Sequence, residues 1–216
     1  MRFTEAAAGL TGRPLPDPLP PPPAQLQPTT TDAGGAAGRP GPSWPAPTRA
    51  SAVLVLLFPD AAGEARVVLT ARPSAARRHA GEISFPGGAL EPGDASAEAA
   101  ALREAREEVG LDPVAARVRL VGRLDEVAIG PSGFRLTPVL ALATRSPSLV
   151  ADPVEVAAIL TPPLAAFLPG APIADRRLER DGWILRFGAY VVEERVIWGA
   201  TARILGQLGA LLRSVS

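Results

Sequence analysis

Three glutamates on one stripe of a predicted helix are the residues of this chain best suited to chemistry. Glu104, Glu107 and Glu108 are spaced i, i+3 and i+4, so a helix places their carboxylates side by side. Glu104 and Glu108 carry like charges at i,i+4, which costs an isolated helix roughly 0.2–0.5 kcal/mol. A divalent cation converts that repulsion into coordination, because hard ions such as Mg2+ take carboxylate oxygens and then hold substrate phosphates. The spacing is therefore compatible with a metal site for phosphate chemistry.

A solvated helix face is the ordinary alternative for neighbouring glutamates. The flanking residues argue against it, since Gly87-Gly88 precedes the helix and REAREEVGL runs to Leu111. The two glycines are expected to turn the backbone tightly and bring it close to phosphate or metal, which places both in the substrate-binding set. Phe85-Pro86 fixes the approach of this loop, because the residue before a proline is restricted to extended conformations.

The segment from Gly88 to Leu111 resembles the Nudix box, the motif of hydrolases that act on nucleoside diphosphates linked to another group. The family pattern is Gly, five residues, Glu, seven residues, then Arg-Glu-apolar-any-Glu-Glu-any-Gly-apolar. The last part is filled by Arg103, Glu104, Ala105, Glu107, Glu108, Gly110 and Leu111. The first acidic position is Asp94 instead of glutamate, and one extra residue separates it from Arg103. These departures weaken the case for Asp94 and nearby Glu91 as ligands and leave the helix unchanged.

The resemblance implies an α/β fold, a Nudix-like α/β/α sandwich with a mixed sheet, and Mg2+ or Mn2+ bound by the three glutamates. It also implies that Arg103 pairs with a carboxylate and holds the box in shape; an ordinary i,i+4 pair with Glu107 is the alternative. Nudix enzymes recruit the general base from different places. Glu82, Glu108 and Glu155 are the candidates here.

The residues before the box resemble a narrower group, the coenzyme A pyrophosphatase branch of Nudix enzymes. Val67 to Gly88 reads VVLTARPSAARRHAGEISFPGG, and this branch shows Thr-x-Arg, then His-x-Gly-Glu, then Phe-Pro-Gly-Gly. GFRLTPVLAL and IWGATARIL also look like this branch, so the resemblance runs roughly from Arg49 to the end. It implies hydrolysis of coenzyme A to 4′-phosphopantetheine and adenosine 3′,5′-bisphosphate.

Coenzyme A carries a 3′-phosphate besides its diphosphate, so its enzyme needs additional positive charge. Arg72, Arg77 and Arg78 form the basic cluster closest to the box in sequence, and the planar fork of arginine suits phosphate. Arg72 is the first candidate for substrate phosphate, and Arg77 or Arg78 the second. His79, the only histidine, is either a structural hydrogen bonder or a substrate contact.

Two other functions fit parts of the sequence. One is a Nudix hydrolase of another nucleotide, such as ADP-ribose or a dinucleoside polyphosphate, against which the HAGEISFPGG string speaks. The other is a catalytically silent domain that binds a nucleotide. The intact glutamates speak against it, because a silent binder has no need of their mutual repulsion.

Composition excludes several other classes of protein. The 216 residues suit one domain with an extension, or two small domains. The net charge is formally zero, so the whole chain offers no electrostatic case for nucleic-acid binding. The chain has no cysteine, which excludes disulfides, thiolate nucleophiles and soft metal sites.

Segments that would cross or target a membrane are not expected. The longest apolar run, 52–58, is far shorter than the ~20 residues that span a bilayer. The beginning, MRFTEAAAGL, lacks the apolar region of a secretory signal. We therefore expect a cytoplasmic protein that acts on a small nucleotide, without nucleic-acid or membrane partners. Since Nudix domains often dimerise, a homodimer is one expected state.

The first 48 residues form a separate zone. Twelve of the 25 prolines lie there, and proline removes backbone donors and fixes φ. The sequence predicts a disordered tail over 1–48 with polyproline II character, apart from a short helix around Thr4 to Leu10. The Nudix-like domain is expected over 49–216.

Within that domain, apolar and β-branched runs predict strands around two long helices. Asp94 or Ser96 is expected to cap the first helix, which runs to Val109 and stops at Gly110. The second helix is predicted over 200–212. The expected strands are 52–58, 66–71, 82–85, 117–125, 134–143, 155–161 and a hairpin of 176–180 with 184–190, and a short helix is expected at 164–168.

Overall fold

The computed structural model describes residues 1–12, 14–32, 46–73, 81–130, 132–180 and 182–215. The helices are α1 (Phe3–Thr11), η1 (Ala24–Leu26), α2 (Ala97–Val109), η2 (Leu164–Phe167) and α3 (Gly199–Val215). The strands are β1 (Thr29–Asp32), β2 (Arg49–Pro59), β3 (Ala65–Val67), β4 (Leu69–Ala71), β5 (Ile83–Ser84), β6 (Gly87–Ala89), β7 (Val118–Arg123), β8 (Val127–Ile129), β9 (Phe134–Ala143), β10 (Ala158–Leu160), β11 (Ala174–Arg180), β12 (Trp183–Val192) and β13 (Arg195–Ile197). None of the described helices is long and apolar enough to span a membrane.

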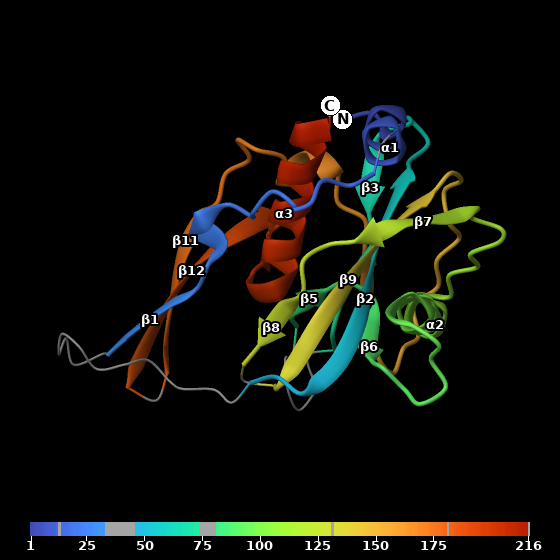
Figure 1. Cartoon of the computed structure of the whole chain (residues 1–216). Coiled ribbons are helices and arrows are strands. Elements are labelled where there is room, and N and C mark those ends of the chain that lie inside the picture. Colours follow the sequence, from blue (N-terminus) through green and yellow to red (C-terminus); the bar gives the residue numbers. More distant parts are fainter. Residues whose placement is uncertain (13, 33–45, 74–80, 131, 181, 216) are drawn as a thin grey trace.

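A six-stranded mixed sheet lies at the centre of the molecule (Figure 1). Its order is β3-β2-β9-β7, with β6 paired to β2 and β8 paired to β9. The long strands β2 and β9 run parallel, and the other pairs are antiparallel. Both long strands are buried over most of their length, which explains their nearly continuous apolar sequences.

Alternate side chains of β2 supply the two faces of the core. Leu54 and Leu56 pack in one buried cluster with the alanines of α2, whereas Val55 and Leu57 pack in the other with the leucines of α3. The two helices therefore cover opposite faces of the sheet, as Figure 1 shows. This arrangement confirms the predicted α/β fold with a mixed sheet between helical layers.

Two smaller sheets complete the fold. One has the order β10-β4-β5, and the other has the order β1-β12-β11 with β13 paired to β12. The predicted strand 66–71 is divided at Val68 into β3 and β4, which belong to different sheets. The hairpin of β11 and β12 is confirmed, although residue 181 of its predicted turn lies outside the described residues. Strands β8 (Val127–Ile129) and β13 (Arg195–Ile197) are not among the strands expected from the sequence.

The N-terminal region differs from the disordered tail that the sequence predicts for 1–48. The helix expected around Thr4 to Leu10 forms as α1, and Leu10 and Leu26 are each only 1% exposed in the core that contains α3. Strand β1 adds to the edge of β12, from Thr29 opposite Arg186 to Asp32 opposite Trp183. Prolines prevent regular structure between these elements, but the apolar side chains still reach a partner in α3. The predicted disorder is therefore wrong for residues 1–12 and 14–32, and 33–45 lie outside the described residues.

Candidate active site

Helix α2 holds the three glutamates on one rigid element. The hydroxyl of Ser96 accepts the backbone N–H of Ala99 at 3.2 Å, which caps the first turn. Gly110 adopts the left-handed conformation (φ 62°) and ends the helix, as glycine does most readily. Both predicted ends of the helix are confirmed, with Ser96 and not Asp94 as the cap.

Arg103 is the centre of an ion-pair network on this helix. Its Nη1 lies 2.9 Å from Oε1 of Glu104 and 2.9 Å from Oε2 of Glu107. Its Nε and Nη2 donate to the two carboxylate oxygens of Asp94, and Nη2 also donates to the carbonyl of Ala89. The i,i+4 pair with Glu107 is therefore present, but it is one part of a larger arrangement. Asp94, which the sequence left doubtful as a ligand, lies against Arg103.

Glu108 is the most deeply buried of the three glutamates. It is 6% exposed, and its Oε2 accepts the backbone N–H of Gly87 at 3.1 Å. Burial raises its pKa to about 7, the Gly87 hydrogen bond and the charge of Arg72 lower that pKa, and the charges of Glu104 and Glu155 raise it. Burial also raises the pKa of Glu104, against the lowering effect of Arg103. Two carboxylates are thus held where removal from water and mutual repulsion disfavour their charges.

The two glycines of the turn are needed for different close approaches. A Cβ at Gly88 would overlap the carboxylate of Glu104. A Cβ at Gly87 would overlap the carbonyl oxygen of Ala52 and crowd Val53 on β2. Gly88 therefore gives the Glu104 carboxylate its space, and Gly87 lets the turn pack on the sheet.

The other predicted site residues divide into two groups. Arg72 and Glu155 are both exposed, and their charges act on the pKa of Glu108, so both lie within electrostatic range of that carboxylate. The backbone N–H of Arg72 donates to the carbonyl of Glu82 at 3.1 Å, which places the two residues on adjacent strand ends. The predicted contacts Arg77, Arg78 and His79 lie outside the described residues.

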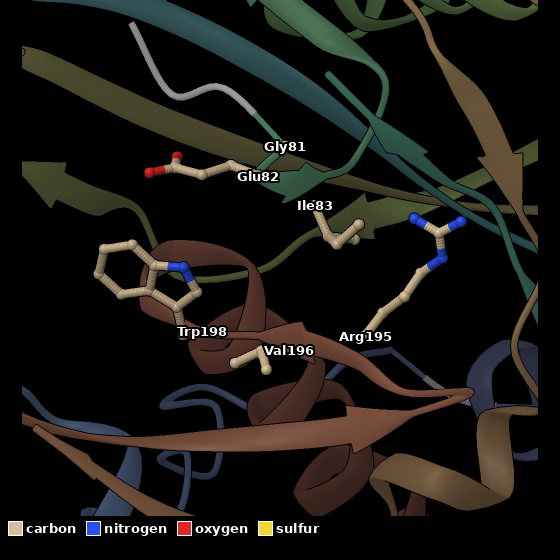
Figure 2. A pocket seen from close by; sticks show the side chains of 6 residues that line it. All are labelled: Gly81, Glu82, Ile83, Arg195, Val196 and Trp198. Atoms are coloured by element: carbon tan, nitrogen blue, oxygen red, sulfur yellow. The ribbon is translucent and has the colours of Figure 1, made fainter. Parts of the chain in front are cut away.

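The side chain of Glu82 lines a separate cavity of about 370 Å3 (Figure 2). Its walls come from β5 and β13 with the residues beside them: Gly81, Glu82, Ile83, Arg195, Val196 and Trp198. None of the three glutamates of α2 lines it. Sequence reasoning did not select Arg195 or Trp198, although Trp198 belongs to the IWGATARIL segment already noted.

The chemistry of these side chains suits a hard divalent cation, since carboxylate oxygens are the ligands that Mg2+ and Mn2+ prefer. The positions of these side chains in the structure suit a cation less well than their chemistry does. Within the described part of the chain no group of three acidic or histidine side chains is arranged to hold a metal ion. A cation at this stripe would compete with Arg103 for the oxygens of Glu104 and Glu107. The donor types fit a metal, and the side-chain positions would have to adjust to it.

Comparison with known proteins decides the family. Residues 48–178 match the model of the NUDIX domain, which spans the central sheet and the whole of α2. The chain belongs to the Nudix family. It is 37% identical over 142 residues to the Nudix hydrolase NudL of Photorhabdus laumondii, covering 66% of this chain and 74% of that protein. It is also 37% identical over 164 residues to the chloroplastic Nudix hydrolase 22 of Arabidopsis thaliana, where the match covers 72% of this chain and 52% of that protein.

Among solved structures, the Nudix hydrolase RenU of M. smegmatis aligns with a TM-score of 0.45 and 25% identity, over 55% of this chain and 72% of that chain. The match to the NUDIX domain and to Nudix hydrolases makes this chain a hydrolase by family, and Nudix hydrolases generally use divalent metal ions. The N-terminal elements up to β1 and the helix α3 lie outside the matched range.

Proposed function

We propose that this Nudix hydrolase cleaves the diphosphate of coenzyme A or a derivative of it, with Mg2+ or Mn2+, to give 4′-phosphopantetheine and adenosine 3′,5′-bisphosphate. One observation carries the proposal. The two segments that resemble the coenzyme A branch, 67–88 and IWGATARIL, are far apart in sequence but in contact: the buried hydroxyl of Thr201 donates to the carbonyl of Ile83 at 3.0 Å. The cavity that contains Glu82 and Trp198 lies where these segments meet.

The three glutamates and Arg103 have distinct roles in this proposal. Glu104, Glu107 and Glu108 would hold the cation, and Arg103, joined to Asp94, orients the carboxylates of Glu104 and Glu107. With a divalent cation bound, the site gains a Lewis acid that activates water and offsets phosphate charge. Arg72, whose charge acts on Glu108, binds a substrate phosphate oxygen.

The reaction itself is a displacement at one phosphorus of the diphosphate. A water oxygen attacks that phosphorus, the bridging P–O bond breaks, and the second phosphate leaves with the bridging oxygen. The proton of the water passes to a carboxylate. We favour Glu108 or Glu155 over Glu82 for this role, because Glu108 lies on the stripe and Glu155 within electrostatic range of it, while Glu82 lines the neighbouring cavity.

Substrate comparison tests the proposal. Purified full-length protein is supplied with coenzyme A, dephospho-coenzyme A or ADP-ribose, with Mg2+ or Mn2+, and the products are separated by chromatography. Coenzyme A should give the highest kcat/KM, and Glu107→Gln should remove most of the turnover. A clear preference for ADP-ribose would show that coenzyme A is not the preferred substrate, and the proposal would fail. Binding without turnover in both proteins would identify a silent nucleotide binder. A cytoplasmic location and a homodimer remain predictions.

A further inference from the structure

The residues that line the cavity between β5 and β13 include an aromatic ring and a cation that have no role in the chemistry proposed for the glutamate stripe. It is about 370 Å3 in volume, which lies within the range of roughly 300–1,000 Å3 for small-molecule sites. Figure 2 shows Trp198 and Glu82 on one side and Arg195 on the other, with Ile83 and Val196 between them. An aromatic ring, a cation and a carboxylate thus line one small space.

Trp198 offers this space a supported aromatic surface. Its indole packs on the ring of Phe187 from β12, with ring centroids 4.7 Å apart and an interplanar angle of 37°. Trp198 is half-buried, so part of the indole is left to the cavity that it lines. Aromatic side chains held in this way stack on nucleobases, because every base presents a flat π-face.

Arg195 offers a cation that no acidic side chain in the described part of the chain neutralises. It is exposed at the start of β13, and no acidic side chain of the described chain forms an ion pair with it. The preceding turn is tight, since Glu193 and Glu194 both have positive φ (51° and 64°) between the paired residues Val192 and Arg195. A guanidinium across a small cavity from an aromatic ring is suited to a phosphate group attached to a nucleoside whose base lies on that ring.

The cavity is close enough to the glutamate stripe to share one substrate with it. Glu82 lines the cavity, and Gly87, five residues later, donates its backbone N–H to Glu108. Five extended residues span at most roughly 18 Å. A ligand bound in the cavity can therefore place an attached diphosphate at the glutamates.

We propose that this cavity binds the 3′-phosphoadenosine part of the substrate, with the adenine base on Trp198 and the 3′-phosphate on Arg195. The inference rests on the proposed function, because it assumes a substrate with this group attached to the diphosphate. The pantetheine arm is the other part of coenzyme A that could enter. It has neither an aromatic ring for Trp198 nor an anionic group for Arg195, so the cavity suits it less well.

The test compares coenzyme A with dephospho-coenzyme A, which lacks only the 3′-phosphate. In the wild-type protein, kcat/KM should be higher for coenzyme A. Arg195→Gln should lower kcat/KM for coenzyme A by about 10–100-fold, as expected for the loss of a charged hydrogen bond, and change that for dephospho-coenzyme A by less than about twofold. Arg195→Lys should restore part of the preference, because it keeps the charge. Arg119→Gln, a change at an exposed arginine of β7, is the matched control and should leave both values unchanged.

Trp198 is tested by its effect on both substrates. Trp198→Ala should weaken the binding of coenzyme A and of dephospho-coenzyme A by the same factor, because both carry adenine. Circular dichroism shows whether the variant is folded. If Arg195→Gln lowers turnover of the two substrates equally, or of neither, the assignment of the 3′-phosphate is overturned. If 4′-phosphopantetheine binds more weakly to Trp198→Ala while adenosine 3′,5′-bisphosphate is unaffected, the cavity belongs to the pantetheine arm and the inference fails.

A binding measurement separates this inference from the proposed function. Calorimetric titration with adenosine 3′,5′-bisphosphate and with AMP requires no turnover. If the protein does not hydrolyse coenzyme A but still binds the bisphosphate more tightly than AMP through Arg195, the cavity assignment stands and the proposed function fails. If coenzyme A is hydrolysed and Arg195→Gln changes neither binding nor turnover, the proposed function stands and the cavity assignment fails.

Discussion

Arg103 donates two parallel hydrogen bonds to Asp94: Nε lies 3.1 Å from Oδ1 and Nη2 lies 3.0 Å from Oδ2. The same guanidinium reaches Glu104 and Glu107 through Nη1. The loop before α2 is thereby fastened to the carboxylates of the helix. The arrangement gives the acidic residue at Asp94 a structural role, since it holds Arg103 beside the glutamates.

Replacing Arg103 tests this positioning role. Lysine keeps the charge but cannot contact Asp94 and two glutamates at once, so Arg103→Lys should lower kcat by about 10–100-fold, the usual effect of losing a residue that orients metal ligands. The Mg2+ concentration for half-maximal activity should rise as well, which a merely structural defect would not cause. Arg106→Lys, at an exposed position of the same helix, is the control and should behave like wild type.

The buried carboxylate of Glu108 should destabilise the folded, metal-free protein, although hydrolysis requires it. Its folded pKa of about 7 lies above the ordinary 4.5, so the metal-free protein loses stability as pH rises through this interval and carries the full penalty above it. Glu108→Gln still offers an oxygen to the Gly87 N–H and carries no charge. At pH 8 this variant should unfold at a higher denaturant concentration than the wild type, with a free energy of unfolding about 1–3 kcal/mol larger. Its hydrolytic activity should be lost. At pH 4.5 the gain should disappear. Equal stabilisation at both pH values would contradict the role of burial.

Gly87 and Gly88 should respond differently to a single added methyl group. Gly88→Ala meets the end of the Glu104 side chain, which can move, so activity should fall by at least about tenfold while stability changes little. Gly87→Ala meets backbone of β2, which cannot yield as easily, and should cost about 1–3 kcal/mol in the free energy of unfolding. Measuring turnover and urea denaturation for both variants checks the contrast. The explanation fails if the two variants behave alike.

Glu98 and Arg123 connect α2 to β7 and should show a pH-dependent contribution to stability. Two contacts of 2.7 and 2.8 Å join their side chains, and the hydrogen bond from Arg123 lowers the pKa of Glu98 to about 2. Because the folded pKa lies below the unfolded value of 4.5, the contribution is complete above pH 4.5 and is lost as pH falls towards 2. The pair is partly exposed, so Glu98→Gln should cost only about 0.5–1 kcal/mol at pH 7. A double-mutant cycle with Arg123→Gln measures the coupling, which should vanish near pH 2.

The N-terminal elements should be part of the folded core. Leu26 is 1% exposed and its Cδ1 lies against Gly206 of α3, leaving no space for a side chain at that glycine. Leu26→Ala should therefore lower the free energy of unfolding by about 2–5 kcal/mol. Val114→Ala, at a side chain that is 87% exposed, is the control and should have little effect. An unchanged denaturation curve for Leu26→Ala would show that this segment is not packed in solution.

The sequence by itself determined the features that depend on neighbours along the chain. Ser96 and Gly110 define the ends of α2, and the spacing of Glu104, Glu107 and Glu108 places them on one stripe, because capping and the helical repeat are local properties. The long buried strands and the class of fold could be predicted for the same reason, since strings such as 52–58 are apolar over their whole length.

Only the tertiary structure decided how buried each of these groups is and what it meets. Nothing near Glu108 in sequence indicates that it is 6% exposed, and nothing near Arg103 indicates that Asp94 is its partner. The proline-rich start was misjudged because composition reports a low tendency for regular structure but not a distant surface, here α3, on which Leu10 and Leu26 can be buried. The cavity of Trp198 and Arg195 likewise exists because β13 packs beside β5, and burial and packing of this kind depend on contacts between residues remote in sequence.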